Sequence, residues 1–329
     1  MNILVVGGAG YVGSHIVKQL IEADHKVVAL DNLQTGHQAA VHKAAAFIKG
    51  DVRDKALLKM IFSDTSFDMV FHTAASASVS ESIEKPLVYF DNNVGGLLAL
   101  LETMNQFSVK NLIFSSTAAV YGDVSEGPIT EETEVRPKNP YGESKHMMET
   151  ILQWCHSAYD LNYVILRYFN VAGADLAGEI GEDHRPETHL IPVVLEVPLG
   201  TREGITILGS DYPTKDGTTV RDYIHVTDLS NAHLAAMQYL LEGNESTLFN
   251  VGSATGFSTL EIIRKVEEYT GTTIPITYGE RRSGDAHSLV ASSKKIQDLL
   301  GWQPKYTDLD TIIRTAWNWH KNHPNGYED

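Results

Sequence analysis

The stretch ILVVGGAGYVG, residues 3–13, decides the fold class of this chain. Residues 3–6 form a short apolar run that ends at a glycine-rich turn, and apolar side chains then recur at helical spacing as far as Ile21. We therefore predict a buried strand, a tight turn and a helix. Gly7, Gly10 and Gly13 allow the backbone to approach a phosphate closely, and the N–H groups that open the helix carry partial positive charge. The stretch is typical of a dinucleotide-binding unit.

A second apolar run, residues 26–31, ends in the acid Asp31. A carboxylate at this position can accept hydrogen bonds from both hydroxyls of an adenosine ribose, and it would repel a 2′-phosphate. No arginine follows Asp31 before Arg53. The sequence therefore favours NAD over NADP.

The alternation continues through four more apolar runs at 46–52, 68–72, 111–115 and 162–166. Helical patterns at 54–62, 86–106 and 142–159 separate most of them. Apolar strands joined by helices predict right-handed crossovers and a parallel sheet covered on both faces. The expected class is α/β, a Rossmann-type doubly wound sheet whose ligands bind at the carboxyl ends of the strands.

The length of 329 residues exceeds one ordinary core, so we expect a second, smaller domain. The strand and helix rhythm weakens near residue 170. We assign 1–170 to an NAD-binding domain, to which 222–250 partly return, and 171–329 to a mixed α/β substrate-binding domain. In the second part we expect helices at 189–201, 228–241 and 308–320 and short strands at 205–208 and 219–224.

Composition narrows the possible partners. The net charge of −16 argues against nucleic acid and anionic membranes, because such partners select for clustered Lys and Arg. The single cysteine, Cys155, permits no internal disulfide and indicates a packed thiol in a reducing compartment. We expect no secretion signal and no membrane span, hence a cytoplasmic protein. His72 has no ligand partner at metal-binding spacing, so we interpret it as a packed histidine and expect no metal.

The segment NPYGESK, residues 139–145, carries the candidate chemistry. If Pro140 occupies the first turn of a helix, Tyr141 and Lys145 lie on the same face, one turn apart. A cation beside a tyrosine favours the phenolate and would let the phenol act as a base near neutral pH. The alternative is a solvated helix on which this permissive spacing occurs by chance.

Several further motifs occur in a fixed order. They are residues 7–13 (GGAGYVG), 31–33 (DNL), 91–94 (DNNV), 114–122 (FSSTAAVYG) and 141–145 (YGESK), followed by 166–170 (LRYFN), 181–183 (GED), 211–214 (DYPT) and 220–226 (VRDYIHV). Together they resemble the extended short-chain dehydrogenase/reductase superfamily and, within it, the UDP-glucose 4-epimerase family. The resemblance covers essentially the whole chain.

The resemblance implies an NAD-dependent isomerase of galactose metabolism that acts on UDP-glucose and UDP-galactose as a homodimer, with helices 86–106 and 142–159 in the contact. Tyr141 would take the proton from the sugar 4-hydroxyl as hydride passes to NAD, leaving a 4-keto sugar. Lys145 would lower the phenol's pKa and hold the nicotinamide ribose, and Thr117 would bridge the sugar and the tyrosine.

The resemblance also assigns binding residues. The implied cofactor residues, besides Tyr141 and Lys145, are Gly7, Gly10, Tyr11, Val12, Gly13, Asp31, Asn32, Leu33, Thr35, Gly36, Asp51, Val52, Thr73, Ala74, Ala75, Asn92, Ser115 and Phe169. The implied substrate residues, besides Thr117 and Tyr141, are Asn170, His189, Leu190, Thr206, Ile207, Leu208, Arg221, Arg282, Asp285 and Leu289. Two arginines suit a diphosphate, whereas the neighbouring Arg281 is interpreted as a solvated residue.

Other interpretations of these residues and of the function remain. Thr117 could simply cap backbone at a strand end. Related dehydratases carry an Asp-Glu pair where this chain has Ala118 and Ala119, which argues against elimination chemistry. A non-catalytic NAD-sensing module is a further alternative.

The chain departs from the epimerase pattern at three positions. Some epimerases have Lys where this chain has Ala77, and others have Asn where it has His189. Leu289 stands where some members have a bulky Tyr, so the pocket could admit an N-acetyl group on carbon 2 of the sugar.

Overall fold

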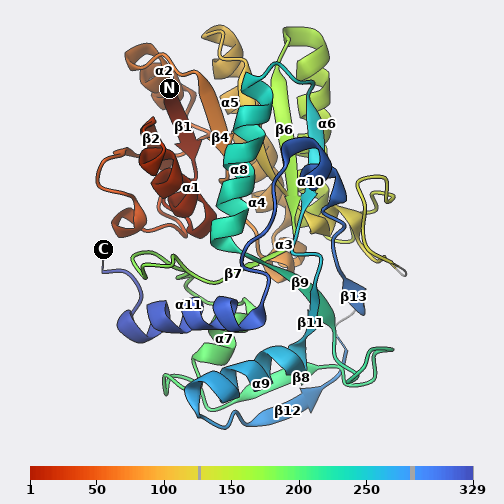
Figure 1. Cartoon of the computed structure of the whole chain (residues 1–329). Helices are drawn as coiled ribbons and strands as arrows, with labels where there is room; N and C mark the ends of the chain where they lie inside the picture. Colours follow the sequence, from red (N-terminus) through yellow and green to blue (C-terminus); the bar gives the residue numbers. More distant parts are fainter. Residues whose placement is uncertain (125–126, 282–285, 329) are drawn as a thin grey trace.

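A seven-stranded parallel sheet forms the centre of the computed structural model, which describes residues 1–124, 127–281 and 286–328 (Figure 1). The strand order is β10-β6-β5-β4-β1-β2-β3. The strands are β1 (Asn2–Val6), β2 (Lys26–Asp31), β3 (Ala46–Lys49), β4 (Met69–His72), β5 (Asn111–Thr117), β6 (Asn162–Tyr168) and β10 (Thr247–Val251). The predicted α/β class and doubly wound parallel sheet are confirmed.

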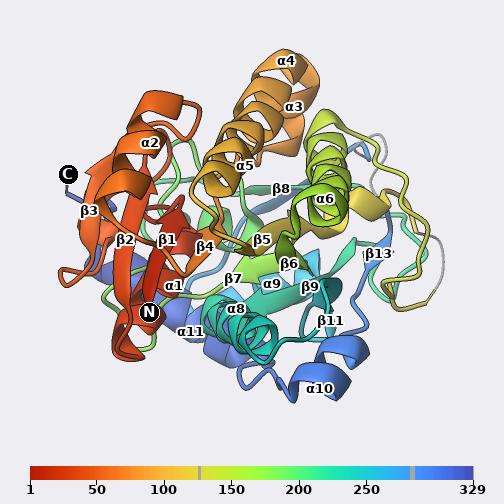
Figure 2. The same cartoon turned by 90° about the horizontal axis from the view of Figure 1, so that it is seen from above.

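Helices cover both faces of this sheet (Figure 2). One face packs on α1 (Tyr11–Glu22), α8 (Val226–Leu241) and α10 (Lys294–Leu300). The other packs on α2 (Lys55–Asp64), α5 (Gly96–Gln106) and α6 (Pro140–Tyr159). Because both faces are covered, β4 is buried at every residue, which explains the continuous apolar runs in the sequence.

A smaller α/β layer lies beyond the carboxyl ends of the parallel strands (Figure 1). Its sheets contain β7 (Asn170–Ala172), β9 (Val220–His225), β11 (Gly256–Ser258) and β13 (Ser288–Leu289), and a separate pair, β8 (Ile205–Leu208) with β12 (Ile276–Gly279). Its helices are α7 (Leu190–Leu195), α9 (Thr259–Thr270) and α11 (Leu309–Asn322), which share an apolar core of their own. The interface between the two layers is therefore where ligands of the main sheet would meet the second part of the chain.

The chain returns to the main sheet more often than the sequence indicates. α8 packs on α1 and β6, within the segment expected to return. β10 then joins the sheet edge beside β6, and α10 covers it. β10 was missed because its run, TLFNV, is only five residues long and begins with two half-buried positions, so it shows neither a long apolar run nor a clear alternation.

The segment expected as one helix over 86–106 is divided. It comprises α4 (Pro86–Tyr89), a π-helical segment η2 (Phe90–Gly95) and α5, and a short α3 (Val79–Glu84) precedes it. The predicted helix 189–201 is α7 alone, and turns follow it. Two short 3-10 segments, η1 (Gln38–Ala40) and η3 (Ala118–Tyr121), complete the described elements. None of the helices in the described ranges combines the length and apolarity that a bilayer span requires.

Candidate active site

The start of α6 positions the predicted Tyr and Lys. The Asn139 side chain accepts a hydrogen bond from the Gly142 N–H at 2.9 Å and caps the helix. Pro140 occupies the first turn, where its missing N–H leaves no bond unmade. Tyr141 and Lys145 follow one turn apart, 9% and 2% exposed. The alternative interpretation, a solvated helix face, is therefore wrong for these two residues.

Lys145 is held against the end of β5. Its Nζ donates to the Ser115 carbonyl oxygen at 2.7 Å and lies 5.0 Å from the centre of the Phe114 ring. Burial lowers the pKa of Lys145 to about 7, although the charge of Glu149 opposes this shift. Burial therefore weakens the preference of Lys145 for its charged form.

Thr117, the last residue of β5, contacts the phenol of Tyr141. Its hydroxyl oxygen accepts from the Ala119 N–H at 3.1 Å, so the capping role anticipated for a strand-end Thr is present. Burial raises the pKa of Tyr141, and a hydrogen bond with the Thr117 side chain lowers it in part. The Lys145 ammonium donates to the Ser115 carbonyl oxygen and desolvation dominates the pKa of Tyr141, so the expectation that Lys145 lowers this pKa stays a prediction.

A buried ion pair one turn beyond Lys145 was not anticipated from the sequence. Glu149 accepts from Arg167 Nε at 2.9 Å and from Ser116 Oγ at 2.5 Å. Arg167 also donates to the Tyr121 hydroxyl at 3.0 Å, and that hydroxyl donates to Asn250 Oδ1 at 2.7 Å. The network ties α6 to β5, β6 and β10. The i, i+4 spacing of Lys145 and Glu149 on one helix face is the signal that could have revealed it.

The glycine turn between β1 and α1 leaves no room for a side chain at Gly7 or Gly13. A Cβ on Gly13 would lie 1.9 Å from the Gly7 carbonyl oxygen, and one on Gly7 would lie 2.5 Å from the Ala74 nitrogen. Gly10, the N-cap residue of α1, has no side chain that could accept hydrogen bonds from the first N–H groups of the helix. This arrangement fits the diphosphate of a dinucleotide.

Asp31, which ends β2, and Asp51, which follows β3, fit the adenosine end of NAD. Asp31 is 9% exposed, and its carboxylate accepts from the backbone N–H groups of Ala9 at 3.0 Å and Leu33 at 2.8 Å. Arg53 is held by Asp51 and Asp91 at 2.6 and 2.5 Å. Because this arginine is neutralised by two carboxylates, it is not a ready partner for a 2′-phosphate.

The other implied cofactor residues lie along the same rim. The Thr73 hydroxyl donates to the carbonyls of Val6 at 2.9 Å and Gly7 at 3.1 Å, just after β4. Asn92 donates to Ser76 Oγ at 3.1 Å from the π-helical segment. Most of the remainder follow the ends of β2, β3, β4 and β6: Asn32, Leu33, Thr35, Gly36, Val52, Ala74, Ala75 and Phe169. Ser115 lies within β5, two residues before its end.

The implied substrate residues come from the second layer. Asn170 lies on β7, Leu190 starts α7, and Arg221 lies on β9 opposite Leu289 of β13. Leu289 packs with a cluster that contains Ala118 and Phe169, which brings it beside the rim of the main sheet. Arg282 and Asp285 lie outside the described residues.

Two nearby expectations need refinement. On β8, Thr206 is exposed, whereas the Ile207 side chain is 3% exposed and belongs to the core of the second layer. Only the backbone of Ile207 could therefore meet a ligand. Arg281, interpreted as solvated, contacts Asp211 at 2.6 Å and lies 4.3 Å from the centre of the Tyr212 ring.

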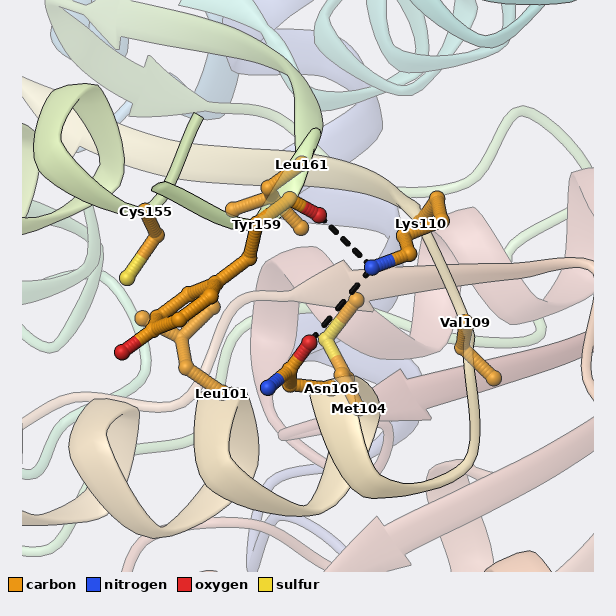
Figure 3. A pocket seen from close by; sticks show the side chains of 8 residues that line it. All are labelled: Leu101, Met104, Asn105, Val109, Lys110, Cys155, Tyr159 and Leu161. Atoms are coloured by element: carbon orange, nitrogen blue, oxygen red, sulfur yellow. Dashed lines mark hydrogen bonds between the residues drawn. The ribbon is translucent and has the colours of Figure 1, made fainter. Parts of the chain in front are cut away.

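Cys155 lies in a small hollow between α5 and α6, away from these residues (Figure 3). Leu101, Met104 and Leu161 line it, and burial raises the pKa of the thiol. Lys110 closes one side by donating to the Tyr159 carbonyl at 2.6 Å. A thiol with a raised pKa is a poor nucleophile, in agreement with a packing role.

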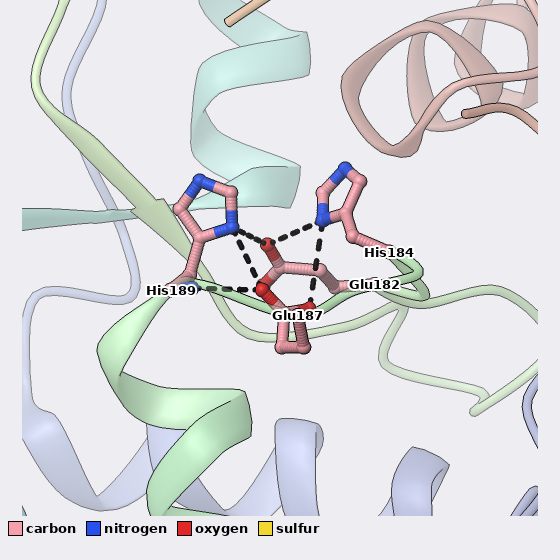
Figure 4. Close-up of side chains that lie close together, drawn as sticks. All are labelled: Glu182, His184, Glu187 and His189. Atoms are coloured by element: carbon pink, nitrogen blue, oxygen red, sulfur yellow. Dashed lines mark hydrogen bonds and ion pairs between the residues drawn. The ribbon is translucent and has the colours of Figure 1, made fainter. Parts of the chain in front are cut away.

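The loop 182–189 brings two histidines and two glutamates together (Figure 4). The charge of Glu182 raises the pKa of His189 to about 11, against the effect of burial. Burial lowers the pKa of His184, but hydrogen bonds to Glu182 and Glu187 outweigh it and raise the pKa to about 9. His189 thus turns its Nδ1 toward carboxylates, and this cluster is a site that the sequence reading missed.

The parallel sheet, the glycine turn with Asp31, and a buried Tyr and Lys one turn apart define the class of protein: a dinucleotide-dependent enzyme of the short-chain dehydrogenase/reductase type. Residues 3–252 match the family described as NAD dependent epimerase/dehydratase. The chain belongs to this family, and its cofactor is NAD.

Relatives extend the match to the full length. The UDP-glucose 4-epimerase of Lacticaseibacillus casei is 56% identical over 329 residues, which cover 100% of this chain and 99% of that protein. A crystal structure of a UDP-glucose 4-epimerase superposes with a TM-score of 0.98 at 53% identity, over 100% of both chains. The UDP-glucose 4-epimerase of Bifidobacterium longum, solved with NAD+ and UDP, superposes with a TM-score of 0.94 at 38% identity, over 99% of this chain and 100% of that one.

Proposed function

We propose that this chain interconverts UDP-glucose and UDP-galactose by inverting carbon 4 of the sugar, a reaction of galactose metabolism. The observation that carries the proposal is the buried Tyr141 phenol, hydrogen-bonded to Thr117 and one helical turn from Lys145. The full-length similarity to proteins named for this activity supports it.

Inversion requires removal of hydride from an unactivated carbon, and bound NAD supplies the acceptor that no side chain can provide. Tyr141 takes the proton of the 4-hydroxyl and later returns it, so it acts as base and then as acid. Thr117 orients the phenol. Because burial raises the pKa of Tyr141, the phenolate needs positive charge nearby, and Lys145 supplies it when protonated.

The nucleotide sugar is assigned to 171–329 and NAD to 1–170, to which 222–250 partly return. Arg221 and Arg282 would bind the diphosphate because guanidinium groups pair bidentately with phosphate oxygens. Asp285 would hold the uridine ribose, and Asn170, His189, Leu190 and 206–208 would surround the sugar and uracil. Few, local cations would thus bind an anion on a chain whose net charge is −16.

The test couples the reaction to a dehydrogenase specific for UDP-glucose, with UDP-galactose as the substrate. We expect the wild type to produce NADH in the coupled assay and Tyr141→Phe to keep NAD but lose most turnover. Tyr159→Phe, at the exposed end of the same helix, is the control and should keep full activity. No NADH from wild type despite bound NAD would reject the proposal, and it would favour a sensing module or another nucleotide-sugar reaction.

A second candidate activity is the epimerisation of UDP-N-acetylglucosamine. Leu289 is smaller than the tyrosine of some relatives and packs beside Phe169 and Ala118. We expect wild type to form the 4-epimer, seen by chromatography, and Leu289→Tyr to lose about tenfold or more of this activity relative to that on UDP-galactose. Absence of the product with wild type would exclude relaxed specificity.

We also infer a homodimer through α4, α5 and α6. Large apolar side chains are exposed on this side: Leu87 at 81%, Trp154 at 72% and Leu98 at 50%. Figure 2 shows these helices on one side of the sheet. An apolar surface of this kind is typical of an interface. Sedimentation at micromolar concentration should give twice the chain mass, and a monomer would contradict the inference.

A further inference from the structure

We propose that Glu182, His184, Glu187 and His189 form a zinc site that fixes the loop between β7 and α7 beside the cofactor turn. The four side chains converge on one point (Figure 4). One ligand atom from each lies within 4.8 Å of every other. The site is separate from the Tyr141 pair, and it uses only Nδ1 of His189, so Nε2 of this ring stays available to the substrate pocket proposed above.

The spacing of the donor atoms matches a tetrahedral ion. Zinc binds imidazole nitrogen and carboxylate oxygen at about 2.0–2.1 Å, so adjacent ligands of a regular tetrahedron lie about 3.3 Å apart. His184 Nδ1 lies 3.2 Å from Glu182 Oε1 and 3.5 Å from Glu187 Oε2. His189 Nδ1 lies 2.9 Å from Glu182 Oε1 and 3.0 Å from Glu187 Oε1. The two histidines contact different oxygens of Glu187, so this carboxylate must turn and the widest pair, up to 4.8 Å apart, must close before the four atoms enclose an ion.

The charges in the cluster balance a divalent cation. The side chains of Glu182 and Glu187 are only 5% and 8% exposed, and two buried carboxylates require two positive charges close by. Two imidazolium groups can supply these charges, and one zinc ion with two neutral imidazoles would supply the same number, because each Nδ1 gives up its proton when it binds the ion. The donor set contains no thiolate, and two imidazoles with two carboxylates suit zinc better than calcium or magnesium, which take oxygen ligands.

The surroundings hold the ligands in place. Glu187 Oε1 accepts from the backbone N–H groups of Thr188 at 2.7 Å and His189 at 2.8 Å, which orients this carboxylate. The Tyr327 hydroxyl accepts from the Gly181 N–H at 2.9 Å and anchors the start of the loop. The His189 side chain is 50% exposed and provides the route by which an ion enters.

Four protein ligands leave no open position, so the site is structural rather than catalytic. The His184 ring lies 6.5 Å from the ring of Tyr11 in an edge-to-face contact, and Tyr11 opens α1 at the glycine turn. α7 begins directly after His189. An ion here would brace the second layer against the turn that binds the cofactor.

The experiment uses the full chain treated with EDTA, desalted, and titrated with zinc chloride alone. We expect one zinc per wild-type chain, an increased melting temperature with zinc, and cobalt(II) absorption bands typical of tetrahedral coordination. His184→Asn and Glu187→Gln should each weaken zinc binding by at least about tenfold. His42→Asn, a histidine outside the cluster, should bind as wild type does.

If the wild type retains no more zinc than the two variants, the four residues form an ion-pair cluster only, and the proposal is overturned. Far-UV circular dichroism establishes whether the variants are folded. If they are not, X-ray absorption at the zinc edge of the wild type decides, because two nitrogen and two oxygen ligands at about 2.0 Å support the site. A six-oxygen shell would refute it.

Discussion

Glu149→Gln tests whether the buried ion pair behind the catalytic helix stabilises the fold. The Glu149 and Arg167 side chains are 2% and 5% exposed, so the variant leaves a buried guanidinium without its counter-charge. Removal of one partner from a buried pair costs about 3–5 kcal/mol. The amide oxygen can still accept from Arg167 or Ser116, so we expect a loss near the lower limit, about 3 kcal/mol.

The measurement is urea unfolding followed by far-UV circular dichroism, with refolding checked at each concentration. For a chain of this size an m-value of about 3 kcal/mol/M converts the expected loss to a midpoint about 1 M lower. Asp298→Asn is the matched control, since it removes the same charge from an exposed pair with Lys294 at 2.7 Å. Such surface pairs contribute about 0.5 kcal/mol or less. Equal midpoints for the two variants would refute the reasoning.

Two further predictions concern the cofactor turn and Lys145. Gly13→Ala should lose NAD, because its Cβ would lie 1.9 Å from the Gly7 carbonyl oxygen; the measurement is the amount of cofactor released on denaturation. Gly95→Ala, whose Cβ would lie 3.6 Å from Asp91, is the control. Full retention of NAD by Gly13→Ala would contradict the expectation. Lys145 has a pKa lowered to about 7 from 10.5, so the unfolded chain binds more protons between these values and stability rises with pH there. Relative to Lys145→Met, the cofactor-free wild type should therefore gain about 2 kcal/mol of unfolding free energy from pH 7 to 9. A difference independent of pH would show that Lys145 does not titrate in this range.

The parts of the fold that could be predicted are those in which local pattern and tertiary context agree. Residues 3–13 switch from an apolar run to helical spacing at glycines that the turn requires, and the structure has β1, the turn and α1 there. The end of β2 at Asp31 and the start of α6 at Pro140 follow from equally local signals. The structure of a segment can be predicted from the sequence where the segment contains its own turn and capping residues.

The parts that could not be predicted depend on distant partners. β10 is a strand because β6 offers it an edge, and nothing within its five residues requires that. The π-helical segment at Phe90–Gly95 lets Asn92 and Asn93 reach Ser76, a contact invisible to helical periodicity. The loop at 182–189 carries the spacing Glu-x-His-x-x-Glu-x-His, but only its folded path brings the four side chains together.

The pKa values at the active site show why the spacing of Tyr141 and Lys145 does not by itself predict which of the two is charged. The pattern of a tyrosine one turn from a lysine suggests mutual support, in which the ammonium lowers the phenol's pKa. In the structure one physical cause, burial, acts on both groups: it raises the pKa of Tyr141 and lowers that of Lys145. Desolvation thus favours the uncharged form of each, and only Thr117 and Glu149 act in the opposite direction. The charge of Glu149 therefore supports the ammonium on which a phenolate at Tyr141 would depend, and its removal should impair both stability and proton transfer.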